Sequence, residues 1–208
     1  IIAAMEGIPV VNCDGNGRAV PELNTGLLPI FEIPISPLVL SGGKGDVNVS
    51  YLDDPLDSKT AENIARSICM IYGMVIGFST WIVNKHDIID KLAPHTVGKC
   101  LEIGRAINNA RSEKSDAITA IKEVVECKEY FRGVIEKIDG KTESGFDFAD
   151  CYIEGVGSYK GKSCSIASKN ENMFIKDESG KVLLTIPELI CVFDLKNYAP
   201  LTNADIQE

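Results

Sequence analysis

The sequence predicts a two-part α+β protein, in which a helical α/β segment (residues 1–128) precedes an all-β module (residues 129–208). Two observations lead to this prediction. Up to residue 128, apolar residues recur at helical spacing between short β-branched runs. From Glu129 onward, short β-rich runs are separated by Gly, Asp and Asn at a spacing of roughly ten residues, which is typical of a small barrel or sandwich.

The first segment opens on Ile1–Met5, which has no initiator methionine and is predicted to be the last turn of a helix that begins earlier. We therefore expect the chain to be part of a longer protein. The β-branched run Ile8–Cys13 is predicted to form a buried strand after this helix. Two further apolar runs, at residues 36–40 and 47–52, flank the Gly-rich stretch Ser41–Asp46 and indicate a hairpin.

An amphipathic helix is predicted to begin at Asp57 or Ser58, both good N-cap residues, and to end near Gly73. Its apolar residues recur at i, i+3, i+4 and i+7. A strand is expected over residues 76–83, and three more helices over 85–92, 96–111 and 115–127. Ser115 is the expected cap of the last helix, with Asp116 in its first turn, where the helix dipole favours a carboxylate.

The β-rich runs of the second part are expected to be separate strands. The first is predicted to end at Ile138, because Asp139-Gly140 reads as a turn. The expected strands cover residues 131–138, 146–154, 163–168, 173–176, 182–185 and 189–194.

The composition excludes several classes of protein. Thirty acidic and twenty-one basic residues give a formal net charge of −9, and the basic residues are scattered, so we expect no nucleic-acid partner. No apolar run approaches the ~20 residues that span a bilayer, and no membrane association is expected. The seven cysteines are odd in number and have neither a disulfide nor a zinc spacing, which favours free thiols in a reducing cytoplasm.

The stretch from Asp14 to Glu22 carries the main candidate site. Asp14 or Glu22 could serve as a general base or as a metal ligand, and Arg18 could hold a carboxylate or imide oxygen. The alternative is a structural turn with an Asp–Arg ion pair. A dinucleotide fingerprint is not present, because Val20 stands where its third glycine belongs and Pro21 follows.

Other candidate ligand-binding residues lie elsewhere. His95 stands at the start of a predicted helix, where free N–H groups favour an anion, or it is simply a capping or surface residue. Asn170 and Glu171 offer an amide and a carboxylate that could hydrogen-bond a cyclic amide. The alternative for these two is a turn between strands.

Taken together, several segments resemble the S-methyl thiohydantoin desulfurase family, which is associated with hydantoin-utilisation genes. The resemblance covers nearly the whole chain. Its segments are Gly7–Leu23, Ala65–Cys69, Leu101–Ile107, Phe131–Ile135, Gly145–Phe146, Ile153–Gly155, Asn170–Asn172 and Ile186–Ile190. It implies an N-terminal α/β domain and a C-terminal β domain, preceded by a Gly-rich stretch and followed by a short tail that this chain lacks. Asn12 stands where the family pattern has an aspartate.

The resemblance implies a cytoplasmic, hydrolase-like enzyme that acts on a cyclic imide or thiohydantoin-type small molecule. In this interpretation water attacks the carbon that bears the sulfur. Asp14 or Glu22 would act as the base, or as ligands of a divalent metal, while Arg18, Asn170, Glu171 and His95 would bind the substrate. The alternative is a non-catalytic partner or ligand-binding subunit of a hydantoinase-type system. In either case we expect a small-molecule ligand, and self-association into a homo-oligomer is compatible with the sequence.

Overall fold

An open antiparallel sheet of five strands forms the largest element of the computed structural model, which describes residues 1–202 and 205–206. Its strands follow one another as a meander, in the order β10-β9-β8-β7-β6. They are β6 (Gly133–Glu143), β7 (Phe146–Gly155), β8 (Ser163–Lys169), β9 (Glu171–Asp177) and β10 (Val182–Thr185). Since β6 and β10 are the two edges, the sheet does not close into a barrel. The all-β character of this part is confirmed.

One face of the large sheet carries the core of this lobe. Cross-strand partners Cys151, Ile166 and Ile175 are buried on it together with Cys164. Side chains from β11 (Val192–Phe193) and from the segment before β6 cover these residues. β11 pairs with β12 (Pro200–Leu201) as a separate two-stranded sheet. We call β6 to β12, with the 3₁₀ helix η2 (Gly157–Tyr159), the C-terminal lobe.

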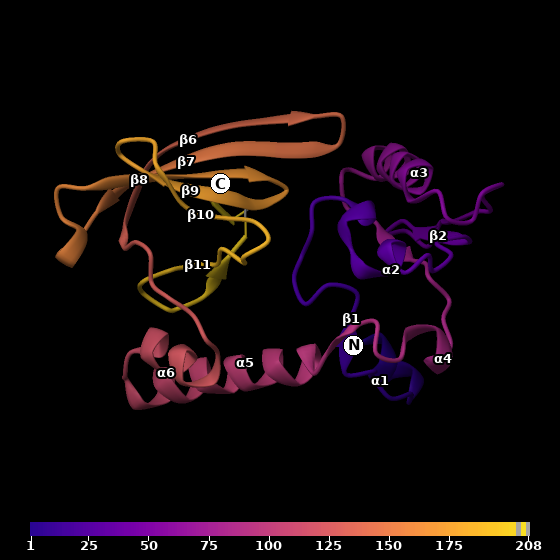
Figure 1. The fold of residues 1–208 in the computed structure, drawn as a ribbon, viewed down its shortest axis with the longest axis horizontal. Coiled ribbons are helices and arrows are strands. Elements are labelled where there is room, and N and C mark those ends of the chain that lie inside the picture. The colour runs from indigo at the N-terminus through magenta and orange to yellow at the C-terminus, as the bar shows by residue number, and fades with distance from the viewer. Residues whose placement is uncertain (203–204, 207–208) are drawn as a thin grey trace.

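A smaller α/β lobe lies beside this sheet (Figure 1). Its three-stranded sheet has the order β3-β2-β4, and Ile35, Leu38 and Ala61 form its core. The elements are η1 (Leu23–Thr25), α2 (Leu27–Ile30), β2 (Leu38–Ser41), β3 (Val47–Ser50), α3 (Ser58–Ile71), β4 (Gly77–Ser79) and α4 (Lys85–Ile88). We call them the N-terminal lobe. The hairpin predicted from the two apolar runs is present as β2 and β3.

Helix α3 begins as its sequence predicts. The Asp57 side chain accepts a hydrogen bond from the backbone N–H of Thr60 at 2.9 Å, which satisfies one of the free donors of the first turn. The helix turns back at Gly73, whose φ of +74° lies in the left-handed region that glycine adopts without steric cost. Its apolar face contributes Ala61 to the core of the lobe.

Two helices run beneath the C-terminal lobe (Figure 1). Helix α5 (Thr96–Glu113) leads into α6 (Ala117–Val124), and the two pack against each other. The expected cap of α6 was wrong by one residue. Asp116, rather than Ser115, is the N-cap, because its extended backbone lets its side chain accept the N–H of Thr119 at 3.1 Å.

Two strand predictions were also wrong. Ile8–Cys13 is not a buried strand, since Val10 and Val11 are 61% and 65% exposed and only Cys13–Asp14 pairs, as β1, with β5 (Ala93–Pro94). Because β1 pairs over only these two residues, the apolar run before it is not covered by neighbouring strands and remains exposed. Strand β6 continues past Asp139-Gly140, because these residues pair with Asp150 and Ala149, and the turn falls at Ser144-Gly145.

The N-terminal turn of helix is present as α1 (Ile2–Glu6), whose C-cap Gly7 is left-handed. Among the residues that the structure describes, no helix has both the length and the apolar character needed to cross a bilayer.

Candidate functional site

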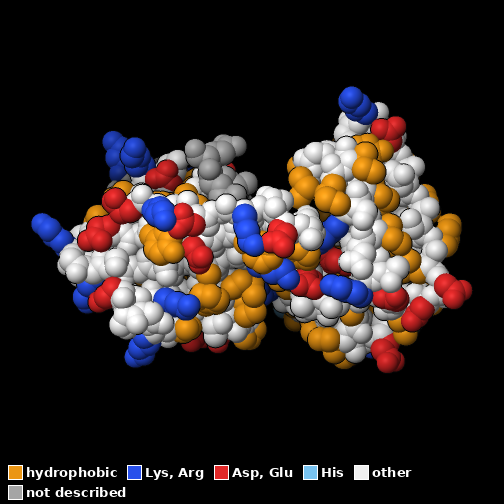
Figure 2. All heavy atoms as spheres, turned by 90° about the horizontal axis from the view of Figure 1, so that it is seen from above, with side chains coloured by type: hydrophobic (Ala, Val, Ile, Leu, Met, Phe, Trp, Pro, Cys, Tyr) orange, Lys and Arg blue, Asp and Glu red, His pale blue; other side chains and the backbone are white. Residues whose placement is uncertain are grey.

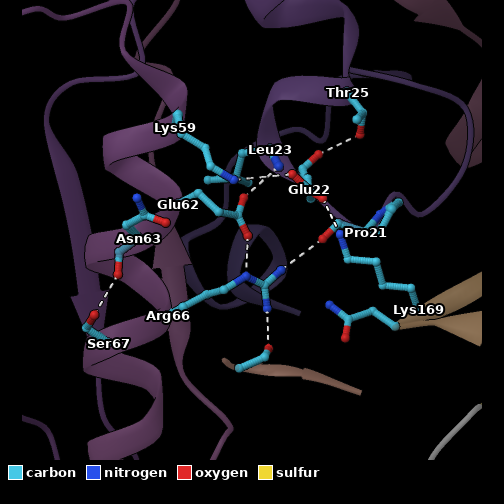
Figure 3. Close-up of polar contacts among 12 residues, drawn as sticks. Pro21, Glu22, Leu23, Thr25, Lys59, Glu62, Asn63, Arg66, Ser67 and Lys169 are labelled. Atoms are coloured by element: carbon cyan, nitrogen blue, oxygen red, sulfur yellow. Dashed lines mark hydrogen bonds and ion pairs between the residues drawn. The ribbon is translucent and has the colours of Figure 1, made fainter. Parts of the chain in front are cut away.

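Charged side chains from both lobes meet where the lobes face each other (Figures 2 and 3). The Glu22 carboxylate, just before η1, forms an ion pair with Lys169 at the end of β8. Lys59 of α3 lies 3.6 Å from the other carboxylate oxygen. The hydrogen bond from Lys169 and the charges of both lysines lower the pKa of Glu22, although partial burial opposes them. Glu22 is therefore ionised and held in place at neutral pH.

Arg66 of α3 joins three segments at the same junction (Figure 3). Its Nε lies 2.5 Å from the carboxylate of Glu62, one turn earlier in the helix, and Glu62 is almost fully buried. Its two terminal nitrogens donate to the carbonyls of Pro21, at 2.8 Å, and Gly145, at 2.5 Å. The guanidinium also stacks 3.7 Å from the ring centre of Phe146 in β7. Arg66 thus fixes the β6–β7 turn against the segment that carries Glu22.

Arg18 makes a second connection between the lobes. Its Nη1 donates to the carbonyls of Pro187 and Glu188, at 2.7 and 2.9 Å, and its Nε donates to the carbonyl of Ala19. These contacts place the guanidinium near the Glu171 carboxyl at the start of β9. Burial raises the pKa of Glu171, and the positive charge of Arg18 only partly offsets this rise. Of the three candidate carboxyl groups, Asp14 and Glu22 have a lowered pKa and Glu171 has a raised one.

The Cys191 sulfur lies in the same region. Burial raises the pKa of this thiol although part of the residue reaches the surface, and neighbouring Cys127 and Glu171 raise it further against the effect of Arg18. A nucleophilic cysteine needs a stabilised thiolate. This environment keeps Cys191 protonated instead.

Asp14 lies in a separate turn beside the start of α5. Its Oδ1 accepts the backbone N–H of Asn16, at 2.6 Å, and that of Gly17. Burial alone would raise its pKa, but these backbone hydrogen bonds and the nearby Thr96 hydroxyl outweigh burial and lower it. In the described part of the chain, however, the buried Thr96 hydroxyl has no hydrogen-bond partner of ordinary geometry. The carboxylate stabilises its own turn, which agrees with one half of the structural alternative for this segment. The other half, an ion pair with Arg18, is not formed in the described part of the chain, because the Arg18 guanidinium bonds backbone carbonyls.

Asn12, which stands where the family pattern has an aspartate, makes hydrogen bonds to the start of α5. Its Oδ1 accepts the backbone N–H of Gly98, at 2.9 Å, and its carbonyl accepts that of His95, at 2.8 Å. A side chain at Gly98 would crowd the Asn12 amide, since a Cβ there would lie 3.3 Å from Nδ2. Asn12 therefore caps the first turn of α5 from a distant part of the chain, while the exposed His95 is left-handed and caps nothing with its side chain.

Asn170 forms the turn between β8 and β9. Its φ is +57°, and it exchanges hydrogen bonds with Asp147, whose backbone N–H donates to Oδ1 of Asn170 at 2.9 Å. Left-handed asparagine is common at such positions. Asn170 therefore shapes this turn, and the residue also takes part in a further interaction.

The predicted site residues therefore fall into two groups. Arg18, Glu22, Asn170 and Glu171 are near the junction of the lobes, whereas Asp14 and His95 lie at the start of α5. Sequence reasoning missed Glu62, Arg66 and Lys169. For Arg66 and Lys169 a signal was available. Arg66 lies within Ala65–Cys69, a segment that carries the family resemblance, and Lys169 directly precedes another such segment, Asn170–Asn172.

A divalent metal does not fit the residues present. Three or more His, Cys, Asp or Glu side chains do not come together as a possible ligand set anywhere in residues 1–202 and 205–206. Asp14 and Glu22, the expected ligands, are occupied by backbone N–H groups and by lysines. We therefore derive no step that involves a metal.

Comparison with known proteins identifies the class of protein. Residues 56–208 match the family model described as "S-Me-THD-like, C-terminal domain", and residues 1–51 match "S-Me-THD-like, N-terminal domain". The chain belongs to the S-Me-THD-like family, which confirms the resemblance to S-methyl thiohydantoin desulfurases. The two models meet before α3, and the division at residue 128 remains a prediction from sequence character.

A solved structure shares the fold. The X-ray crystal structure of a protein from Chromobacterium violaceum superposes with a TM-score of 0.71 at 21% sequence identity. The match covers 96% of this chain and 53% of that one, so this chain spans about half the length of its structural relative. No curated protein matches this sequence significantly.

Proposed function

We propose that this chain forms part of a hydrolase-like enzyme that acts on a thiohydantoin-type ring or a related cyclic imide, with Glu171 as the group that carries the proton. Membership of the S-Me-THD-like family suggests the class of ring. The observation that carries the assignment of a site is that Glu171, a carboxyl of raised pKa, lies within the electrostatic influence of the Arg18 guanidinium where the lobes meet.

Arg18 is suited to hold a ring oxygen. Its Nη1 and Nε are used by backbone carbonyls, which fix the plane of the guanidinium. Within the described residues Nη2 makes no hydrogen bond, so its two N–H groups are free to donate to a carbonyl of the ring. A positive charge there also stabilises negative charge that develops on this oxygen when the ring carbon is attacked.

Glu171 supplies acid–base chemistry in this proposal. The ionised carboxylate takes a proton from water as the water oxygen bonds to the ring carbon that bears the sulfur. The carbon–sulfur bond then breaks, and the departing thiolate keeps the electron pair and receives the proton from Glu171. A raised pKa suits a carboxyl that must both accept and return a proton. Glu22 and Asp14, expected as catalytic groups, here hold the junction and the Asp14 turn.

The test is turnover by the full-length protein that contains this chain, with an S-methylated thiohydantoin as substrate and thiol release as the readout. Glu171→Gln should lower kcat at least a hundredfold, whereas Glu136→Gln, an exposed glutamate on β6, should leave it unchanged. The double variant Asp14→Asn, Glu22→Gln tests the expectation from the sequence that Asp14 or Glu22 is the base. If it abolishes turnover while Glu171→Gln does not, the proton carrier is not Glu171.

A second candidate function is a ligand-binding subunit without catalysis. It is favoured by the observation that Asp14 and Glu22 have lowered pKa values and are tied into structural contacts. This hypothesis predicts that the full-length protein binds the ring but releases no thiol. It also predicts that activity appears only when a hydantoinase-type partner is added. A cytoplasmic location, a small-molecule ligand and self-association belong to both proposals.

A further inference from the structure

The face of the large sheet that points away from its core carries alternating aromatic, basic and acidic side chains. Alternate residues of a strand share a face, and cross-strand partners lie side by side. Two neighbouring rows result: Lys141, Phe148 and Lys169 in one, and Asp139, Asp150, Ala167 and Phe174 in the next. The face therefore combines flat apolar surfaces with donors and acceptors of hydrogen bonds.

This face is hollowed. A depression of about 730 Å³ is lined by both rows, with strands β6 to β9 as its floor. The small side chain of Ala167 lies directly between Asp150 on β7 and Phe174 on β9, and Phe148 is two residues farther along β7, opposite Lys169. The two rings are therefore two strand spacings, about 10 Å, apart across the sheet and about 7 Å apart along it, which leaves room for a flat ring over Ala167 between them. Lys169 lines the depression and also pairs with Glu22, so the depression opens beside the junction.

The charges that line the depression are mostly neutralised from outside it. Lys141 pairs with Glu143, at 2.5 Å, and Asp139 with Lys137, at 2.6 Å. Lys169 pairs with Glu22. An anion would meet the two aspartates Asp139 and Asp150, which are direct cross-strand neighbours, and a cation would meet Lys141 and Lys169. The depression therefore favours an uncharged polar ligand over a charged one.

We propose that this depression binds a planar, uncharged cyclic amide, stacked against Phe148 and Phe174. Aromatic side chains attract flat rings in offset or edge-to-face contact. A cyclic amide presents N–H donors and carbonyl acceptors in its plane. The Asp150 carboxylate accepts the N–H, since within the described part of the chain it forms no ion pair, and the Lys141 ammonium donates to the carbonyl.

This inference rests on the proposed function for its ligand class, because a hydantoin ring is a planar cyclic amide. It adds a place where the ring is held, on β6 to β9, distinct from Arg18 and Glu171. The ring-binding depression and the proton carrier are thus separate features, and experiments can contradict either proposal without contradicting the other.

Hydantoin itself is the probe, titrated into this chain labelled with ¹⁵N and followed by amide chemical shifts. We expect saturable shifts centred on the residues that line the depression, at 138–141, 148–150, 167–169 and 173–174. Asp150→Asn and Phe148→Leu should each weaken binding roughly tenfold, and Lys160→Met, on the loop at η2, should not change it. 1,3-Dimethylhydantoin, which keeps the ring and carbonyls but has no N–H, should bind at least tenfold more weakly. A spectrum with native dispersion shows that each variant is folded.

Several outcomes would overturn the inference: no saturable shift, equal binding of the dimethylated ring, or binding that Asp150→Asn and Phe148→Leu leave unchanged. Shifts centred on Arg18 and Glu171 instead would place the ring at the junction. This result would contradict binding in the depression and would leave the proposed function intact. Conversely, binding lost in Asp150→Asn with no thiol release by the unaltered full-length protein would support the depression and overturn the catalytic proposal.

Discussion

The Glu22 carboxylate and the Lys169 ammonium form an ion pair across the two lobes, although 147 positions separate them in the sequence. The same ammonium lies 4.3 Å from the ring centre of Phe146, on which Arg66 also stacks. A single lysine at the end of β8 therefore connects the segment before η1 to the β6–β7 hairpin. The connection is polar, so it responds to protonation and to substitution of single charges.

Removing the lysine charge should loosen the junction. In Lys169→Met we expect faster amide hydrogen exchange at residues 21–23 and 145–147, because Glu22 loses its closest partner and Phe146 loses one of its two cations. Hydrogen–deuterium exchange read by mass spectrometry measures this. Lys162→Met, an exposed residue before β8, is the matched control. Identical exchange in the two variants would show that the ion pair does not hold the lobes.

The junction should also weaken in acid. The pKa of Glu22 is lowered from its ordinary value of 4.5, so its folded-state pKa lies below that of the unfolded chain. Its contribution to stability is present above pH 4.5 and is lost as pH falls through the folded-state value. The free energies of urea unfolding of the unaltered protein and of Glu22→Gln should differ at pH 7, and the difference should shrink as the pH falls below 4.5. A difference that stays constant over this range would contradict the ionised state assigned to Glu22.

Arg66→Met should destabilise the protein by about 3 kcal/mol, because it leaves the almost fully buried Glu62 carboxylate without its cation. Adding Glu62→Gln should recover part of the loss, since the residual buried charge is then removed. Denaturant unfolding of the single variants and the double variant gives the coupling free energy. Strictly additive effects would mean that the two side chains act independently.

Asn12→Ala should cost about 1 kcal/mol, because the Gly98 N–H at the start of α5 then loses its acceptor. Asn12→Asp, which restores the residue of the family pattern, should keep the stability or increase it, since a carboxylate is favoured at a helix N-terminus. Thermal unfolding is the measurement, and Asn24→Ala in η1 is the exposed control. Full stability of Asn12→Ala would show that the contact contributes nothing.

The cysteines should divide into two reactivity classes. Burial raises the pKa of Cys151, and burial together with the neighbouring Cys151 and Glu178 raises that of Cys164 to about 12, so both remain thiols at pH 8. Cys100 and Cys127 are exposed. Iodoacetamide followed by peptide mass spectrometry should label Cys100 and Cys127 in the native protein, and Cys151 and Cys164 only after unfolding. Early labelling of Cys164 would contradict its place in the core.

Local sequence signals predicted the elements whose formation is local. The Asp57 cap and the apolar period of α3 identify that helix within one residue at its start, because capping and helical periodicity depend on neighbours along the chain. The β2–β3 hairpin was predicted for the same reason. Asp139-Gly140, in contrast, has the composition of a turn, yet ten residues of β7 pair with β6 across it, and long-range pairing overrides the local preference.

The candidate site was predicted only in part, for a related reason. Residue types that can do acid–base chemistry are visible in the sequence, but their pKa values depend on what surrounds them. Glu22 and Glu171 were both plausible carboxylates, and only the fold shows that one meets Lys169 and the other becomes buried. The partners of Arg18, at Pro187 and Glu188, are likewise set by the packing of the lobes.

Helix α5 makes a mechanical connection between distant surfaces. Its eighteen residues span about 27 Å, with Asn12 bonded to its first turn and the Arg111 guanidinium in its last turn donating to the carbonyl of Asn197. A helix of this length behaves as a stiff rod on the scale of thermal fluctuations. The Asn12–Asp14 turn and the loop before β12 are therefore held at a fixed separation by one stiff helix.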